Sequence, residues 1–183
     1  MNYDRYAKKI YEQNVAVGWW DDPDRCLYTT MQLVSTEVAE GTEGERKNLM
    51  DDHLPHRRMG EVELADALIR VLDLGGKLGL SYDLYVPYMN WAEPGNTIGK
   101  QHLAINCSLV SFAYDYDTWT KNSSEINFEE LNRRYSELIN TIARVADNQK
   151  YDLKSAADEK LLFNLTRADH QRDARKEEHG KAF

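Results

Sequence analysis

The sequence predicts an all-α, soluble protein, and its 183 residues suit one compact domain, residues 1–183. Proline and glycine are scarce, with 4 and 10 residues, so few positions would break a helix. Hydrophobic residues make up 42% of the chain and recur at steps of three and four, the period of one helix face. This length and composition are enough for the hydrophobic core of a helical bundle.

Apolar periodicity places the first three helices. Residues 2–16 are expected to form the first, and the glycine and the Asp22-Pro23 step that follow favour a turn. The second and third helices, 24–48 and 59–80, each carry an apolar stripe. The stripes consist of Leu27, Met31, Val34 and Val38 in the second helix and of Leu64, Leu68, Val71, Gly75 and Leu78 in the third.

Prolines mark the segments that are not helical. Residues 48–58 contain Pro55 and are expected to form a loop, because proline cannot occupy a helix interior. Residues 84–99 contain two prolines and are expected to be irregular. The last helix is expected to begin after Ser155, a common N-cap residue. The remaining helices are predicted at 100–117, 127–148 and 155–172.

The charge and cysteine content exclude several classes of protein. The net charge is −8, without the basic stripe of a duplex-binding protein, so no nucleic-acid partner is expected. A negative protein can still bind a nucleotide when a divalent cation screens its carboxylates. Cys26 and Cys107 lie far apart and form neither a disulfide framework nor a zinc motif. The sequence shows no signal peptide and no membrane span, so a reduced, cytoplasmic setting is expected.

Two acidic motifs are the strongest functional feature. Glu37 and Glu40 are three residues apart, and so are Glu63 and Asp66. Residues at i and i+3 share a helix face, so each helix offers a carboxylate pair beside its apolar stripe. Antiparallel packing of the two helices would gather four carboxylates, which repel one another unless a cation lies between them. All-oxygen ligands select hard ions such as Mg²⁺ or Mn²⁺, which activate water for attack on phosphorus.

Two other interpretations of these motifs stay open. Acidic residues three or four apart are common on solvated helix faces, so an exposed surface would show the same pattern. A di-iron carboxylate bundle is a second metal interpretation, but such sites use Glu-x-x-His motifs. No histidine follows Glu37 or Glu63 by three residues, which favours a hard ion over iron.

Four separated blocks carry a resemblance to a known family. They are Glu37-Val-Ala-Glu40-Gly, Leu49-Met-Asp-Asp-His-Leu-Pro-His-Arg57, Glu61-Val-Glu-Leu-Ala-Asp-Ala-Leu-Ile-Arg-Val-Leu-Asp-Leu74 and Glu159-Lys160-Leu-Leu-Phe-Asn164-Leu-Thr-Arg167-Ala-Asp-His170. In this order they resemble the MazG-like all-α nucleoside triphosphate pyrophosphohydrolases, especially the small phage members. The last block is similar to the family's closing K-x-x-x-N-x-x-R helix. The resemblance covers about residues 18–84 and 156–172.

The resemblance implies a MazG-like helical bundle that hydrolyses a nucleoside triphosphate to the monophosphate and pyrophosphate. Mg²⁺ would be the cofactor, with Mn²⁺ able to substitute. Either Glu37 or Glu40 would also orient the attacking water, and Lys160, Asn164 and Arg167 would contact the phosphates. By position, the metal ligands would be Glu37, Glu40, Glu63 and Asp66.

The base that the site accepts is not encoded in a recognisable motif. Trp20, His53 and Asn106 are candidates for base contact, since an indole stacks on a base and the other two side chains form hydrogen bonds. Trp19 and Trp20 are adjacent, and packing in the core is the alternative role for this pair. Phage relatives act on the deoxynucleotide pool, and the similar MazZ-type branch implies dGTP as the leading candidate. A dimeric-dUTPase-like hydrolase and a catalytically inactive nucleotide-binding or helical interaction module are the alternatives.

The sequence departs from the family pattern in two places. Thr36 stands where many relatives have a second glutamate. Residues at about 85–155 have no counterpart in the short phage members and are interpreted as an inserted helix pair, which dimeric dUTPases also carry. The resemblance further implies a homo-oligomer, either a dimer or a tetramer, and the host cytoplasm for a phage-encoded protein. An insertion that covers the apolar face within one chain would allow a smaller assembly.

Overall fold

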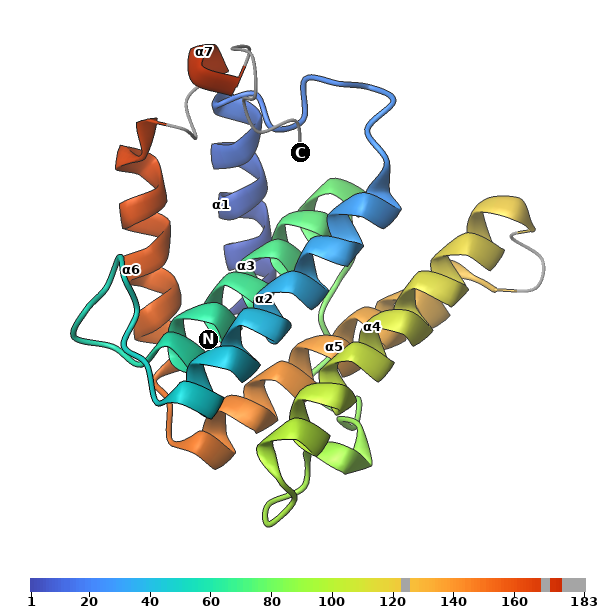
Figure 1. The fold of residues 1–183 in the computed structure, drawn as a ribbon. Coiled ribbons are helices and arrows are strands. Elements are labelled where there is room, and N and C mark those ends of the chain that lie inside the picture. The colour runs from blue at the N-terminus through green and yellow to red at the C-terminus, as the bar shows by residue number, and fades with distance from the viewer. Residues whose placement is uncertain (123–125, 169–171, 176–183) are drawn as a thin grey trace.

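The structure is a computed structural model that describes residues 1–122, 126–168 and 172–175. Within these ranges the regular elements are helices, with an isolated β-bridge between Met50 and Arg58 (Figure 1). The all-α prediction is therefore confirmed. The elements in chain order are α1 (Tyr3–Ala16), α2 (Leu27–Lys47), α3 (Met59–Leu78), the 3₁₀ turn η1 (Asn90–Ala92), α4 (Ile98–Lys121), α5 (Phe128–Gln149), α6 (Leu153–Thr166) and α7 (Arg172–Arg175).

Helix α3 is the central element of the bundle. It packs against α2, α1, α6 and α5, while α4 packs against α2 and α5. Figure 1 shows α2 and α3 side by side and antiparallel, joined by the loop at one end, with α6 crossing that end. Three leucines of α3, Leu64, Leu68 and Leu72, are completely buried. Their spacing of four residues places them on one helix face, and Leu64 and Leu68 belong to the predicted apolar stripe.

The second helix follows its predicted stripe as well. Met31, Val34 and Val38 are buried, and Leu27 at the first turn packs partly against the core. Helix α2 ends where Asn48 adopts a left-handed conformation, with φ of 53°. This backbone turn begins the loop of residues 48–58, which was expected from Pro55.

Several predicted helix boundaries were wrong. The second helix begins at Leu27 instead of residue 24, and the fourth extends to Lys121. The last long helix begins earlier than predicted because Asp152, not Ser155, is its N-cap: the Asp152 carboxylate accepts a hydrogen bond from the Ser155 backbone N–H at 3.0 Å. That helix ends at Thr166, and residues 169–171 of the predicted helix lie outside the described residues.

The segment predicted as an insertion forms an antiparallel pair with its own role in the core. Helices α4 and α5 pack against each other, and each also packs against the α2–α3 pair (Figure 1). Ile105 and Phe112 of α4 and Ile139 and Ile142 of α5 are almost completely buried. The apolar side of α2 and α3 is thus covered within one chain.

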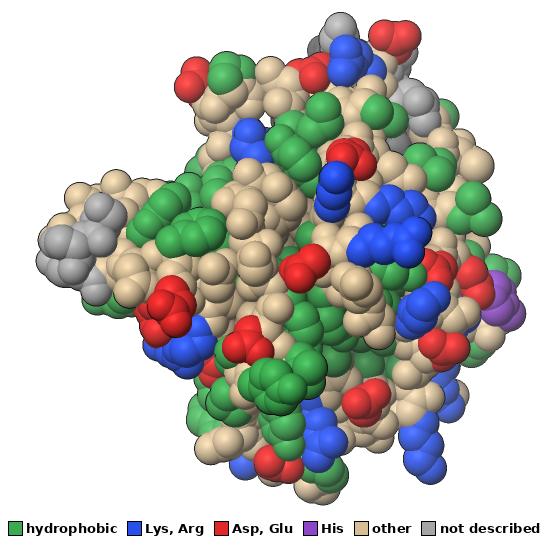
Figure 2. Space-filling model, turned by 180° about the vertical axis from the view of Figure 1, so that it is seen from behind, with side chains coloured by type: hydrophobic (Ala, Val, Ile, Leu, Met, Phe, Trp, Pro, Cys, Tyr) green, Lys and Arg blue, Asp and Glu red, His purple; other side chains and the backbone are tan. Residues whose placement is uncertain are grey.

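Surface charges are mixed on the face drawn in Figure 2. Acidic and basic side chains alternate there, with hydrophobic patches between them. None of the helices in the described ranges combines the length and apolar character needed to cross a bilayer.

Gly75 permits the close approach of α3 and α5. A Cβ atom added at this position would overlap the ring and hydroxyl of Tyr135, which is itself 1% exposed. We therefore expect Gly75→Ala to lower the free energy of unfolding by about 1–3 kcal/mol, as overpacked cores do. Chemical denaturation of the purified protein measures this change.

Gly99 provides the matched control for that substitution. It lies in the first turn of α4, and among the described residues no atom outside its own helix lies within 4 Å of an added Cβ. Gly99→Ala should leave stability unchanged or raise it by up to about 1 kcal/mol. Equal effects of the two substitutions would contradict the packing argument.

Candidate metal centre

Three carboxylates from two helices meet beside the core. Glu37 of α2 and Glu63 and Asp66 of α3 each offer a ligand oxygen, and these oxygens lie within 4.8 Å of one another. Glu37 and Glu63 are each only 6% exposed. The antiparallel packing of α2 and α3 therefore gathers three of the four predicted ligands.

The apolar stripes force these like charges together. Glu37 directly precedes Val38 of the buried stripe, and Glu63 precedes Leu64 on α3. Burying the stripes removes the neighbouring acidic side chains from water as well, and packing of apolar residues supplies the free energy for it. The carboxylates consequently face one another across the α2–α3 contact.

Two basic side chains neutralise part of this charge. Lys160 of α6 is 3% exposed, and its ammonium lies 2.8 Å from Asp66 Oδ2. Arg70 of α3 donates from Nε to Glu37 Oε1 at 2.5 Å. Among the described residues Glu63 forms no ion pair, so its charge is the least compensated of the three.

The pKa values of the acidic groups reflect this environment. Burial, followed by the charges of Asp66 and Glu37, raises the pKa of Glu63 to about 9. Burial also raises the pKa of Asp66 to about 6, against the attraction of Lys160. Burial alone would lower the pKa of Lys160, but Asp66 outweighs it and the net shift is upward. The cluster thus favours added positive charge, supplied by protons or by a cation.

A cavity of about 450 Å³ opens over the cluster. Its walls come from α1, the segment between α1 and α2, α2, the loop of residues 48–58, α3 and α6. This volume lies within the range of small-molecule sites. The predicted site residues among those that line it are Glu37, Glu40, His53, Glu63, Asp66, Lys160, Asn164 and Arg167.

Helix α6 and the loop supply the polar groups opposite the carboxylates. Lys160 and Asn164 are one turn apart on α6, and both line the cavity. Asn164 Oδ1 is buried and has no hydrogen-bond partner among the described residues. Such an atom calls for a partner that enters from the cavity. His53 of the loop packs against Phe163 of α6, with ring centroids 4.7 Å apart.

Arg57 fixes α6 relative to α3. Its guanidinium donates to Glu159 of α6 at 2.7 and 3.1 Å, to Ser155 at 2.7 Å and to Glu61 of α3 at 2.8 Å. Arg57 is a loop residue, so a single side chain joins three elements. Because Glu159 precedes Lys160, this contact also sets where the Lys160 ammonium lies.

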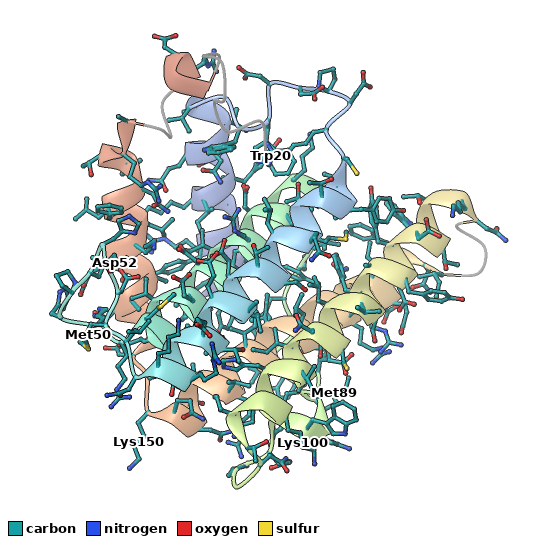
Figure 3. All side chains as sticks on the ribbon, viewed as in Figure 1. Trp20, Met50, Asp52, Met89, Lys100 and Lys150 are labelled. Atoms are coloured by element: carbon teal, nitrogen blue, oxygen red, sulfur yellow. The ribbon has the colours of Figure 1, made fainter. Side chains whose placement is uncertain are left out.

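Three other predicted residues lie less centrally. Glu40 lines the cavity but is exposed, and it is not one of the three clustered ligands. Trp20 and Asn106 are not among the described residues that line the cavity. Trp20 Nε1 donates to Asp73 Oδ1 at 3.1 Å, and Asn106 accepts a hydrogen bond from Ser35 at 2.9 Å. In Figure 3, Trp20 lies near the end of α1, at the opposite end of the molecule from Lys100.

Several cavity residues were not among the predicted site residues. Asn14, Arg25 and Arg70 line the cavity, together with Trp19, the neighbour of the candidate Trp20. The spacing of Arg70, four residues after Asp66 and seven after Glu63, places it on the same face of α3 and could have identified it. The positions of Trp19 and Arg25 depend on how the segment between α1 and α2 folds back, and that of Asn14 depends on how α1 packs against α3, which no periodicity encodes.

The comparisons with protein-family models, with curated proteins and with solved structures found no match to this chain. The chemistry of the site therefore has to be inferred from its own residues.

The donor set fits a hard divalent cation. Its clustered ligand atoms are carboxylate oxygens, and the unpaired Asn164 Oδ1 faces the same cavity. Mg²⁺ and Mn²⁺ prefer such oxygen ligands, whereas zinc sites use nitrogen and sulfur. Thr36, which precedes Glu37, is exposed and donates from its hydroxyl to the Leu33 carbonyl at 2.7 Å.

The raised pKa of Glu63 predicts how stability depends on pH. Between the ordinary pKa of 4.5 and about 9, the folded protein holds a proton on Glu63 that the unfolded chain releases. Without divalent cations, stability should therefore fall as pH rises through this window, by up to about 1.4 kcal/mol per pH unit for one proton. Denaturant titrations at several pH values in EDTA measure the slope.

Glu63→Gln should flatten that slope, and Mg²⁺ should restore stability at high pH in the wild type more than in the variant. Glu129→Gln, an exposed position on α5, is the control and should retain the wild-type slope. A wild-type slope that survives in Glu63→Gln would show that another group titrates.

Proposed function

We propose that the protein is a Mg²⁺-dependent nucleoside triphosphate pyrophosphohydrolase that converts a (d)NTP and water to the (d)NMP and pyrophosphate. The observation that carries the proposal is the cluster of Glu37, Glu63 and Asp66 within 4.8 Å, facing Lys160 in a cavity of about 450 Å³. Carboxylate-bound cations and a buried ammonium are the groups that bind and polarise polyphosphates. The resemblance to the MazG-like family supports the same reaction.

The proposed metal ligands are Glu37, Glu63 and Asp66, with Glu40 at the exposed edge of the cluster. A bound Mg²⁺ would supply charge to hold the phosphates and to lower the pKa of a water molecule. Mn²⁺ has the same preference for oxygen ligands and should substitute for it.

The protein's own residues divide the remaining roles. Lys160, which pairs with Asp66, and Asn164, one turn further along α6, both line the cavity and would bind phosphate oxygens, with Arg167 at the end of α6 as a further contact. Glu40 lines the cavity without belonging to the tight cluster, and partial desolvation there, followed by the charge of Glu37, raises its pKa although the residue as a whole is exposed. A carboxylate of raised pKa at this place is suited to accept a proton from the attacking water, and Glu37 is the alternative.

The substrate belongs by resemblance to the deoxynucleotide pool, with dGTP as the leading candidate. A dUTPase-like preference was motivated by the insertion, but no described residue of α4 or α5 lines the cavity. An inactive nucleotide-binding or interaction module is the non-enzyme alternative, supported by Thr36. We further propose that the protein assembles as a dimer or tetramer and that it is located in the cytoplasm.

The direct test is product analysis. The protein is incubated with each NTP and dNTP and Mg²⁺, and the products are separated by ion-exchange chromatography. We expect the monophosphate and pyrophosphate in equal amounts, and activity lost in EDTA and restored by Mg²⁺ or Mn²⁺. Release of orthophosphate would contradict the proposal. Tight nucleotide binding without turnover at any cation would favour the inactive module.

Glu63→Gln tests the site itself. The substitution keeps the shape of the side chain but removes one anionic ligand, so kcat/KM should fall by at least about 100-fold, the usual cost of losing an electrostatic catalytic group. Glu129→Gln, far from the cavity on α5, should retain wild-type activity. Full activity of Glu63→Gln would place the chemistry elsewhere in the molecule.

A further inference from the structure

The cavity extends well beyond the acidic cluster. Asp73 lies seven residues after Asp66 on α3, hence on the same face and about 10 Å further along the helix. This separation is comparable to that between the α-phosphate and the pairing edge of a purine in an extended nucleotide. With phosphates at the cluster, as the proposed function has them, the base would reach Asp73.

Asp73 is a buried carboxylate that faces this end of the cavity. It is 8% exposed and lines the cavity together with Asn14. Trp20 donates to its Oδ1 at 3.1 Å, and Asn14 is its second hydrogen-bonding neighbour. A carboxylate offers about four acceptor positions, so these neighbours leave capacity for two further donors.

Apolar groups line the walls at the same end. Val17 and Trp19 precede α2, while Leu33 of α2 and Ile69 of α3 also line the cavity. Aromatic and aliphatic walls favour a flat heterocycle, and a few fixed polar groups among them determine which heterocycle fits.

We infer that Asp73 determines base specificity by accepting hydrogen bonds from two adjacent donors of a guanine base, N1–H and the 2-amino group. The inference rests on the proposed function, because it assigns the base end of the same cavity. The Asn14 side chain lies beside Asp73 and would donate to guanine O6.

The other bases do not match an acceptor pair. Adenine presents the acceptor N1 beside its 6-amino group, and cytosine presents the acceptor N3 beside its 4-amino group. Thymine and uracil present one N–H between two carbonyl oxygens. Each of them would place a lone pair against the Asp73 carboxylate, and an unpaired buried acceptor is costly. Guanine is the common base with two neighbouring donors on this edge.

A purely structural role for Asp73 makes a different prediction. The carboxylate also anchors Trp20, whose ring lies under Arg25 and Lys77 at 4.8 and 5.2 Å. If that were its sole role, substitution would weaken all substrates alike. A ratio between two nearly identical substrates therefore distinguishes recognition from support.

The wild-type enzyme provides the first test, which needs no variant. dITP is dGTP without the 2-amino group, so it keeps N1–H and O6 but lacks one donor to Asp73. We expect kcat/KM for dGTP to exceed that for dITP by about 10- to 100-fold, the effect of one hydrogen bond to a charged group. Equal values would overturn the inference.

The second test compares Asp73→Asn with Trp20→Phe. Asp73→Asn has the same shape but one acceptor fewer, so the dGTP-to-dITP ratio should fall at least about tenfold. Trp20→Phe removes the donor to Asp73 and keeps the carboxylate, so its ratio should remain that of the wild type even if both rates fall. An unchanged ratio in Asp73→Asn, or the same loss in Trp20→Phe, would overturn the assignment.

These outcomes separate the two proposals. Turnover of dNTPs to monophosphate with no discrimination between dGTP and dITP overturns the role of Asp73 and leaves the proposed function standing. No turnover of any nucleotide overturns the proposed function, and the role of Asp73 with it.

Discussion

Repulsion among buried carboxylates is the constraint on which the rest of the site depends. Apolar packing of α3 on four neighbouring helices fixes where Glu63 and Asp66 lie, and packing of α2 fixes Glu37. The clustered charges repel one another and destabilise the folded state, so the free energy of burying the apolar core has to outweigh this repulsion. The acidic cluster therefore attracts positively charged groups to one edge of the core.

Helix α6 brings one such positively charged group to the cluster. Lys160 enters the core edge to pair with Asp66, and Arg57 binds Glu159 in the preceding position. Ala156, Ala157 and Leu161 of α6 are buried in the core as well, so the wall of the cavity that α6 forms depends on apolar packing together with these ionic contacts. Asp66 is one of the proposed metal ligands and is also the partner of the Lys160 ammonium, so the proposed metal site and the proposed phosphate site share this residue.

The sequence predicts the parts of this arrangement that obey a helical period. The stripes of α2 and α3 predicted which face of each helix is buried, and the spacing of Glu63 and Asp66 placed both on one face of α3. Contacts between distant segments were beyond such patterns. Asp152 caps α6 in place of Ser155 because local loop geometry selects the cap, and Trp19 rather than Trp20 lines the cavity because the chain turns back at Gly18, where φ is 83°. The position of Asn106 along its helix does not indicate what its side chain contacts, because its hydrogen-bond partner, Ser35, lies on another helix.

The sequence leaves three roles open for residues 85–155: to complete the site, to restrict the substrate or to cover the bundle. The described residues of α4 and α5 do not line the cavity, which favours the last of these roles. Instead, Ile105 and Phe112 of α4, and Ile139 and Ile142 of α5, are buried in the core against the α2–α3 pair. The walls of the cavity come instead from α1, from the segment before α2, from the loop of residues 48–58 and from α2, α3 and α6. Helices α4 and α5 therefore support the α2–α3 pair that carries the acidic cluster, and under the proposed function the base would meet the residues near the N-terminus and the end of α3.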